Sequence, residues 1–438
     1  MTTSPGGRRE VHSHRTPRHR SKAPSRNRLR RIAALTLVFV LAFSTSAIGF
    51  AYTRLQGNID QHDITDLLGT ERPTAAEPTG PTTEDAHEGE TLNFLFMGTD
   101  SRDGANAELD GSGTTGGMRA DTTLLVQVPA DRQSLTVVSI PRDTLVTVPE
   151  CQRPDGSMTY SQSNAMFNSA FNTGSGGTSF AHGAACTIKT VEQLTGVFVD
   201  DFVVVDFQGF IHLIDALDGV PMYVEEDINS READLELVAG CQILDGTDAL
   251  GFARVRKGVG DDGSDISRIG RQQDLMMAVI RDILSSRVLT NPVRLYEVAD
   301  RGTQTLTAGN TLGSIPQLVG LAASMVNLDL NEVVFVTMPF DWQGARVSPN
   351  LEYSEQLWEN LRNGQPVDER ISGPGWEITE RLLADEAAAN ATDEPTDGAS
   401  EPTDEPDDVP EQPTDDVAEP TDDVDDGSAV CTREVAEQ

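Results

Sequence analysis

The chain has 438 residues, of which 70 are acidic and 33 are basic, and its formal net charge is −37. A protein this acidic has no broad basic face with which to neutralise a phosphate backbone, so nucleic acid is excluded as a partner. Any site for an anion must therefore be a local group of arginines.

Residues 1–31 form a basic head. They contain ten lysines and arginines against a single acidic residue, Glu10, and few apolar side chains. Because such a segment cannot bury a core, it is predicted to be disordered. Its positive charge beside an apolar segment predicts that it lies in the cytoplasm.

Residues 32–53 are predominantly apolar and carry no charged side chain. An apolar run of about 20 residues has the length of a helix that crosses a bilayer. A cleaved signal peptide is the alternative, since Ser44–Ala47 is a stretch of small residues. The run is longer than a usual signal core, which favours a retained anchor. Both interpretations export the rest of the chain; the retained anchor predicts a single-pass protein of the cell membrane with its main domain extracytoplasmic.

Residues 54–90 are polar and rich in Thr, Pro and Glu, a composition typical of a flexible stalk between a membrane and a domain.

From residue 91 to residue 384, strand and helix signals alternate, which predicts a single α/β domain. Several short runs are apolar at nearly every position, as in strands covered on both faces, so we expect a mixed central sheet flanked by helices in three layers. The predicted strands are 92–98, 122–128, 135–141, 202–207, 220–224 and 333–339. The predicted helices are 161–171, 184–195, 208–217, 245–253, 267–288, 311–326 and 354–363.

Residues 385–438 read as an acidic tail. Between 385 and 428 there are 18 acidic residues and no Lys or Arg, arranged in an imperfect repeat of acid, Pro and Thr. Such a segment repels itself and is predicted to be a disordered tail of unassigned purpose.

Four cysteines lie on the exported side, where disulfides persist: Cys151, Cys186, Cys241 and Cys431. Four cysteines allow three pairings. The favoured pair is Cys151–Cys186, because it would staple a loop rich in Gly, Ser and Asn. Free thiols remain the alternative.

Charged side chains stand at the ends of three predicted strands. An unpaired charge inside a sheet core is prohibitive, so these groups should face a cleft at the sheet edge, where α/β sheets bind ligands. Two carboxylates there, Asp100 and Asp121, could hold a hard cation. Asp100 as a turn cap, with Asp121 paired to an arginine, stays open as the alternative. The residues concerned are Asp100, Arg102, Asp103, Arg119, Asp121, Arg142 and Asp143.

A fourth stretch gathers arginines before and within the helix predicted at 267–288. Arg254 and Arg256 face one way in extended backbone, and Arg268 and Arg271 share a helix face. A helix opening adds free N–H groups, and guanidinium forks suit phosphate. The alternative is a solvated basic face with internal pairs to Asp261, Asp262 and Asp265.

These motifs together resemble the LytR–CpsA–Psr family. The resemblance covers roughly residues 92–289 and rests on NFLFMGTDSR, RADTTLLVQV, SIPRDTLVTVP, NSAFNTGSGG, VVVDFQGFIHLIDALDGV and LDGTDALGFARVRK followed by GSDISRIGRQQDLM, in family order. It implies a membrane-anchored phosphotransferase that moves a phosphate-linked glycopolymer from a polyprenyl-pyrophosphate carrier to a sugar hydroxyl of peptidoglycan. A polyprenyl-pyrophosphate hydrolase and a non-catalytic polyprenyl-phosphate-binding wall protein are the alternatives.

The resemblance also assigns roles. Asp100 and Asp121 would bind Mg²⁺, with Mn²⁺ as the second choice. The pyrophosphate would be held by Arg119, Arg142, Arg254 and Arg256. Supporting pocket positions would be Arg102, Asp143, Asn168, Asp265, Arg268, Arg271 and Gln272.

This chain departs from the family pattern at one point. The family often has Lys-Ile-Asn where this chain has Met166–Asn168, so the asparagine matches and the lysine does not. Asp143 or Asp103 is the candidate for taking the proton of the attacking hydroxyl. The sequence leaves open which glycopolymer is moved, which acceptor sugar receives it, and the oligomeric state.

Overall fold

The computed structural model describes residues 26–74, 87, 89–100, 117–255, 265–285, 288, 290–326, 328–392 and 431–436. The chain forms two units, Met1–Tyr52 and Thr53–Gln438. Helix α1 spans Arg26–Asn58 and contains the predicted anchor, 32–53. Its segment Arg30–Asn58 is long and apolar enough to cross a membrane.

The second unit is built on a mixed seven-stranded sheet, as predicted. β3 runs antiparallel to both of its neighbours, β2 and β4, while β2 is parallel to β7 and β4 is parallel to β13. At the other side β12 is antiparallel to β7 and parallel to β1. The strands in sheet order are β1 (Asp60–Gln61), β12 (Leu306–Ala308), β7 (Asp201–Asp206), β2 (Leu92–Thr99), β3 (Ala120–Val128), β4 (Leu135–Ser139) and β13 (Val333–Thr337).

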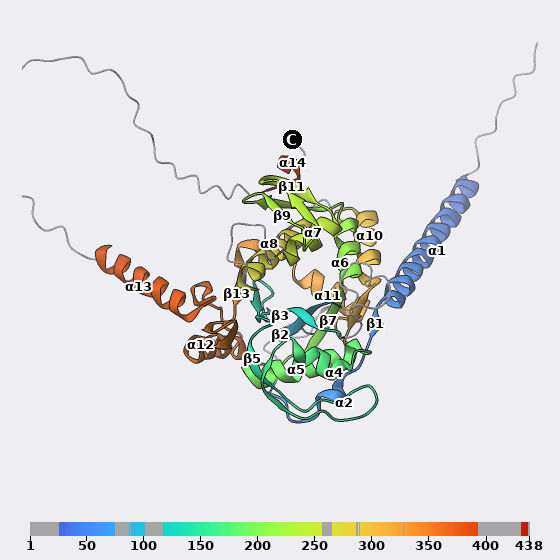
Figure 1. Ribbon diagram of the computed structural model, residues 1–438. Helices are drawn as coiled ribbons and strands as arrows, with labels where there is room; N and C mark the ends of the chain where they lie inside the picture. The colour runs from blue at the N-terminus through green and yellow to red at the C-terminus, as the bar shows by residue number, and fades with distance from the viewer. Residues whose placement is uncertain are drawn as a thin grey trace, which may run out of the picture. The chain divides into compact units, whose positions relative to one another are not determined.

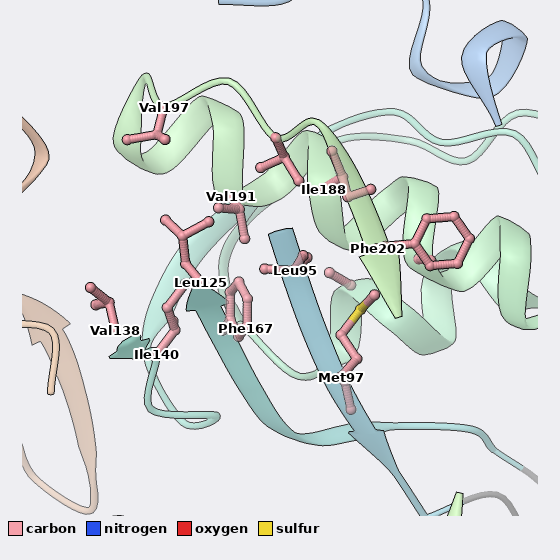
Figure 2. Packing of buried hydrophobic residues seen from close by; sticks show 14 of the residues in the cluster. Leu95, Met97, Leu125, Val138, Ile140, Phe167, Ile188, Val191, Val197 and Phe202 are labelled. Atoms are coloured by element: carbon pink, nitrogen blue, oxygen red, sulfur yellow. The ribbon is translucent and has the colours of Figure 1, made fainter. Parts of the chain in front are cut away.

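Helices cover both faces of this sheet, which gives the three predicted layers (Figure 1). One face packs on α4 (Ser169–Ser175) and α5 (Phe180–Thr195) in a fully buried core. Figure 2 shows Leu95, Leu125 and Phe202 of the sheet meeting Ile188 and Val191 of α5 in this core. The opposite face packs on α8 (Asp265–Ile283) and α11 (Ile315–Ser324).

A second apolar cluster lies beyond α8. It joins α6, α7 and α10 to a group of short antiparallel strands. Its elements are α6 (Phe207–Ala216), β8 (Val220–Val224), β9 (Ile228–Ser230), β10 (Leu235–Leu237), β11 (Gly240–Leu244), α7 (Gly246–Arg254) and α10 (Pro292–Thr303). The remaining described elements are α2 (Thr65–Leu68), β5 (Leu145–Val148), β6 (Gln162–Met166), η1 (Leu330–Glu332), β14 (Phe340–Gln343), β15 (Arg346–Pro349), α12 (Leu351–Arg362), η2 (Glu369–Ile371), α13 (Gly375–Thr392) and α14 (Arg433–Ala436).

The favoured disulfide is confirmed: Cys151 and Cys186 are bonded, with an S–S distance of 2.05 Å. This bond fixes the loop before β6 to α5. The fit between α4 and α5 is close, because a Cβ atom at Gly174 would lie 2.3 Å from the carbonyl oxygen of His182. Only glycine fits there.

The prediction of a flexible stalk is wrong for its first part. β1 pairs with β12, Ile64 and Leu68 are buried in the core, and Arg72 forms an ion pair of 2.6 Å with Glu192. A few apolar side chains spaced through a polar segment are enough to dock it, which average composition does not reveal. Residues 75–86 and residue 88 lie outside the described residues.

The prediction that residues 385–438 form a disordered tail is also wrong at both ends. Helix α13 continues to Thr392, as expected of an alanine-rich segment. At the other end, Cys431 is bonded to Cys241, and Arg433 donates to the carbonyl oxygens of Leu217 and Gly219. Residues 393–430 lie outside the described part of the chain.

The helix predicted at 161–171 is wrong in its first half. Gln162–Met166 is strand β6, which pairs with β5, and α4 begins only at Ser169. Hydrogen bonds to β5 stabilise this segment as a strand. The sequence of the segment alone does not show that this partner is present.

Candidate functional site

The strand ends converge at one edge of the central sheet. β2, β7, β4 and β13 all run in one direction, and β3 runs in the other. The residues that follow β2 and β4 therefore meet the residues that open β3. The sequence predicted this convergence from charged residues at strand ends, and the topology provides it.

A β-bulge places Asp121 at this edge. Gly98 pairs with Thr122 and Thr99 pairs with Ala120, so Asp121 between them has no residue opposite. A bulge re-aims the side chain of the extra residue and is common beside functional sites. The Asp121 side chain is 29% exposed, which leaves it accessible to a ligand.

The turn after β4 holds Arg142 and Asp143. The backbone N–H of Thr144 donates to the carbonyl oxygen of Pro141 at 3.0 Å and closes the turn. Two further backbone bonds tie this turn to the segment before α4: Phe167 donates to Thr144, and Asn168 donates to Arg142. The backbone thus brings three predicted site residues, Arg142, Asp143 and Asn168, together.

Side-chain contacts join these residues to the bulge. Arg142 Nη1 lies 3.1 Å from Asp121 Oδ1, and Arg142 Nε lies 3.8 Å from Asp143 Oδ1. Asn168 Nδ2 lies 3.4 Å from the same oxygen of Asp121. The alternative in which Asp121 pairs with an arginine is therefore what the structure shows, and Arg142 is that arginine.

Asp100 and Arg119 stand opposite each other where β2 ends and β3 begins. The backbone N–H of Arg119 donates to Asp100 Oδ1 at 2.9 Å, and the N–H of Asp100 donates to the Arg119 carbonyl at 3.2 Å. Asp100 therefore caps the end of the strand pair, as the alternative interpretation held. The Arg119 side chain is exposed.

The oxygen donors at this edge fit a hard divalent cation. Asp100 and Asp121 supply carboxylates, and the buried Oδ1 of Asn168 has no hydrogen-bond partner among the residues that the structure describes. Within the same described ranges, no group of three or more His, Cys, Asp or Glu side chains is placed to hold a metal. Further ligands would have to come from substrate phosphate and water, which is how Mg²⁺ is commonly bound.

Arg254 lies at the same end of the sheet. It is the last residue of α7, and its Cζ lies 4.9 Å from the centroid of the Phe207 ring. Phe207 follows Asp206, which pairs with Thr99 at the end of β2. Arg254 therefore comes close to the strand end that leads into Asp100.

Two predicted pocket residues hold the backbone around Arg254. Arg271 Nη2 donates to the carbonyl oxygen of Val255 at 2.6 Å, and Gln272 Nε2 donates to that of Ala253 at 3.1 Å. These bonds flank Arg254 on both sides. Arg271 and Gln272 thus position the arginine segment from helix α8.

The remaining predicted residues are placed less completely. Arg268 is buried near the start of α8, and Asp265 begins that helix with its side chain outside the described part. Arg102, Asp103 and Arg256 lie outside the described residues.

Gln273, the last residue of the arginine-rich stretch that begins near Arg254, lies at the edge of the site. Its Nε2 donates to Ser139 Oγ at 3.0 Å and to Thr337 Oγ1 at 3.2 Å, so it joins the ends of β4 and β13. The only local signal was a second glutamine after Gln272, and that gives no indication of two partners in distant strands.

Comparisons with known proteins agree on one family. The model of the LytR_cpsA_psr family matches residues 51–364. The probable cell wall biosynthesis protein LcpB of Corynebacterium glutamicum is 32% identical over 261 residues, which cover 58% of this chain and 57% of that protein. The cell wall biosynthesis protein LcpA of the same organism is 30% identical over 262 residues, covering 56% of this chain and 49% of that protein. The matches thus span about half of these relatives' length.

Two solved structures are also similar to this chain. A LytR-Csp2A-Psr enzyme from Actinomyces oris is 22% identical with a TM-score of 0.49, and the match covers 69% of this chain and 96% of that one. TagT bound to LI-WTA is 21% identical with a TM-score of 0.46, covering 68% of this chain and 98% of that one.

Proposed function

The chain belongs to the LytR–CpsA–Psr family, and from this premise we propose that it is a membrane-anchored phosphotransferase of cell-wall assembly. Its substrate would be a glycopolymer linked through pyrophosphate to a polyprenyl carrier, and its acceptor a sugar hydroxyl of peptidoglycan. Two relatives named as cell wall biosynthesis proteins support this setting. Helix α1 would be the retained anchor, with the head in the cytoplasm and the second unit outside.

The observation that carries the proposal is the contact between Arg142 and Asp121 beside Asn168. It sets a guanidinium next to oxygen donors that fit a cation, and the Arg142 side chain is only 16% exposed. A diphosphate suits both partners, because guanidinium forks bind phosphate oxygens in pairs, and a divalent cation held by Asp100 and Asp121 would neutralise further phosphate charge. In a partly buried site these charges act with less screening by solvent.

The reaction can be written for this geometry. The acceptor hydroxyl oxygen forms a bond to the phosphorus attached to the glycopolymer, and the bond from that phosphorus to the bridging oxygen breaks. Polyprenyl phosphate leaves with the bridging oxygen and its charge. Arg142 and Arg254 would bind the phosphate oxygens and stabilise that charge as it develops. A bound Mg²⁺ would supply further neutralisation of the phosphate charge.

Asp143 is the candidate for receiving the hydroxyl proton. Its carboxylate is 27% exposed and lies within the same turn as Arg142. A carboxylate held beside the reacting phosphorus can accept a proton from the incoming hydroxyl. Asp103, the other candidate, lies outside the described residues.

The polyprenyl chain requires an apolar surface near this edge. Helix α8 brings Met276, Met277 and Ile280 against the sheet, and α11 brings Leu318 and Leu321. All five side chains are only partly buried and pack against the buried cluster on this face of the sheet. This half-buried apolar surface supports the use of α8 and α11 by the lipid. The apolar side chains Phe210, Leu213 and Ala216 of α6 instead pack against the second cluster.

The test is an Arg142→Ala variant of the full-length protein in detergent, supplied with lipid-linked glycopolymer and peptidoglycan. Loss of a preorganised charge at the reacting group is expected to lower the transfer rate by about 10²-fold or more. Arg301→Ala is the matched control, because Arg301 is an exposed arginine on α10 and should leave the rate unchanged. Transfer by Arg142→Ala at the normal rate would contradict the proposal.

The two alternative functions give different results in the same assay. A hydrolase would release polyprenyl phosphate without acceptor at a rate comparable to transfer. A non-catalytic lipid-binding protein would show no transfer, and its binding of the lipid would not depend on Mg²⁺.

A further inference from the structure

The hairpin of β5 and β6 begins and ends at the candidate site. β5 starts at Leu145, two positions after Asp143, and β6 ends at Met166, two positions before Asn168. The base of the hairpin is closed by the backbone N–H of Asn168, which donates to the carbonyl oxygen of Arg142 at 3.1 Å. A molecule that binds along this hairpin therefore reaches the group proposed to take the hydroxyl proton.

The returning arm of the hairpin is open to solvent. Residues 160–164, which we call the exposed segment, are all exposed, and Tyr160 is 87% exposed. A strand that covers a core buries every second side chain, and this segment does not. Its five residues extend over at most about 14 Å, so a single bound polymer can contact all of them.

The exposed segment lies in a stretch without charge. No Asp, Glu, Lys, Arg or His occurs between Asp155 and His182. The segment itself consists of tyrosine, serine, glutamine and asparagine, whose side chains can donate and accept hydrogen bonds. In a chain with a net charge of −37, such a surface suits a neutral polar partner.

A β-bulge interrupts the hairpin within the exposed segment. The register shifts between Val146 and Val148, so that Ser163 and Asn164 lie opposite the single residue Thr147. Asn164 has a positive φ of 58°, a conformation that few residues other than glycine adopt readily. Bulges re-aim side chains and are common beside active sites. The bulge is a second sign, independent of exposure, that this arm of the hairpin serves a function.

The hairpin is held rigidly to the domain. The disulfide between Cys151 and Cys186 joins it to α5, which lies beside β5 (Figure 1). Just before the exposed segment, Thr159 donates its backbone N–H to the Cys151 carbonyl at 2.8 Å, and its Oγ1 accepts from the Cys151 N–H at 2.9 Å. A surface that is already fixed loses little entropy when it binds a partner.

The hairpin and the proposed lipid surface lie on opposite faces of the central sheet. Val146 and Val148 of β5 belong to the core that α4 and α5 cover. Met276 of α8 and Leu318 of α11 pack on the other face. In phosphoryl transfer the attacking and leaving oxygens are roughly in line with the phosphorus between them. If polyprenyl phosphate leaves toward α8 and α11, the acceptor hydroxyl arrives from the side of the hairpin.

We propose that the exposed segment binds the acceptor glycan strand of peptidoglycan, a proposal that rests on the function proposed above. The acceptor is a polymer, so sugar units beyond the one that reacts must lie on surface that continues from Asp143. The Tyr160 ring would pack on the apolar C–H face of a sugar. The Ser163 and Asn164 side chains would form hydrogen bonds with sugar hydroxyls. The phosphate of the donor would find no counter-charge on this segment.

The test uses full-length Tyr160→Ala and Asn164→Gly variants in detergent. Glycine adopts the positive φ of position 164 readily, so the second variant removes the side chain and keeps the bulge. Each variant should raise the KM for peptidoglycan glycan strands by about tenfold, while the KM for the lipid-linked donor stays unchanged. Binding of isolated glycan strands, measured by calorimetry without donor, should weaken by the same factor.

Two matched controls carry the same substitutions elsewhere. Tyr223→Ala changes a half-exposed tyrosine on β8, and Asn229→Gly changes an exposed strand asparagine on β9. Both should leave the acceptor KM, the donor KM and strand binding unchanged. Tyr160→Phe, which keeps the aromatic ring, should bind strands within about threefold of the original protein.

The outcomes separate this proposal from the proposed function. Strand binding that depends on Tyr160 and Asn164, in a protein that transfers nothing, would refute the phosphotransferase and keep the glycan-binding hairpin. Normal strand binding and a normal acceptor KM in both variants would overturn the glycan-binding hairpin alone. A raised donor KM with normal strand binding would assign the exposed segment to the donor and overturn the proposal as well.

Discussion

The two edges of the central sheet both gather charged residues, but the charges are satisfied in different ways. At the edge where β7 begins, Asp201 accepts backbone N–H bonds from Phe202, Thr311 and Leu312 at 2.6 to 2.8 Å. At the edge where β4 ends, Asp121 is held by side chains, those of Arg142 and Asn168. The backbone N–H groups that hold Asp201 are fixed by the fold and cannot move to bind a ligand. The side chains of Arg142 and Asn168 can rotate away from Asp121 toward a ligand.

The β7-start edge also contains a buried ion pair and a small cavity. Arg72 meets Glu192 through two nitrogens, and Glu192 accepts from the backbone of Val199 as well. A cavity of about 70 Å³ nearby is lined by His62, Arg72 and Asp200 among others. The two pairs differ in the exposure of the carboxylate, because the Asp121 side chain is 29% exposed whereas that of Glu192 is 5% exposed.

The largest effect is expected at Asp201. Asp201→Ala leaves three backbone N–H groups without an acceptor, so the free energy of unfolding should fall by about 3–5 kcal/mol. Denaturant unfolding of the full-length protein in detergent measures this fall. Transfer activity per folded molecule should not change. Asp121→Ala should show the reverse, a stability loss of about 1 kcal/mol and loss of transfer, and equal effects of the two variants would break the comparison.

The next effect concerns Arg72. Arg72→Ala leaves the buried Glu192 without its counter-charge and removes the cation–π contact to Phe198, so stability should fall by about 2–4 kcal/mol. Adding Glu192→Gln should recover part of the loss, because the uncompensated charge is then gone. Thermal unfolding of the single and double variants measures the coupling. If the stability losses of the two single variants simply added up in the double variant, Arg72 and Glu192 would not be energetically coupled.

A pH effect is expected from Asp200. Burial raises the pKa of its carboxyl from 3.8 to about 6, although the N–H of Asn93 and the charges of His87 and Arg72 oppose the rise. Between these pH values the folded chain holds a proton that the unfolded chain releases. The contribution of Asp200 to stability is therefore fully present below about pH 4 and lost as the pH rises through 6, a change of about 2–3 kcal/mol.

Asp200→Asn isolates this contribution. Between pH 4 and pH 7 the original protein should lose unfolding free energy relative to the variant, because the asparagine that replaces Asp200 in the variant does not ionise. Parallel stability curves for the two proteins would show that Asp200 titrates in its ordinary range.

A smaller loss of stability than at Asp201 or Arg72 is expected at Arg271. Arg271→Ala removes the bond to the Val255 carbonyl, so stability should fall by about 1–2 kcal/mol. Because Arg271 positions the segment that carries Arg254, the transfer rate should fall about tenfold. Arg271→Lys, which can still donate to that carbonyl, should restore part of the rate. An unchanged rate in Arg271→Ala would show that Arg254 needs no such support.

The sequence predicted the central strands well because their physical signal is local. Runs such as 92–98 and 135–141 are apolar at nearly every position, and the structure buries them on both faces. β6 was missed because Gln162–Met166 is half polar and includes Asn164 with a positive φ of 58°. Its strand form depends on β5, and pairing between segments is not encoded in either one alone.

The candidate site shows the same division. Charged residues at strand ends were visible in the sequence, and so was the convergence of those ends in an α/β sheet. The bulge at Asp121 and the two bonds of Gln273 both depend on partners in other strands of the sheet. The Cys241–Cys431 bond spans 190 positions and had no local signal.

The most direct test of the central claim is an experimental structure of the full-length protein with a lipid-linked pyrophosphate donor and Mg²⁺. The account predicts diphosphate oxygens within hydrogen-bonding distance of the Arg142 and Arg254 guanidinium groups, with the cation on Asp100 and Asp121. Diphosphate bound elsewhere, for example beside Arg72 at the opposite edge of the sheet, would contradict it.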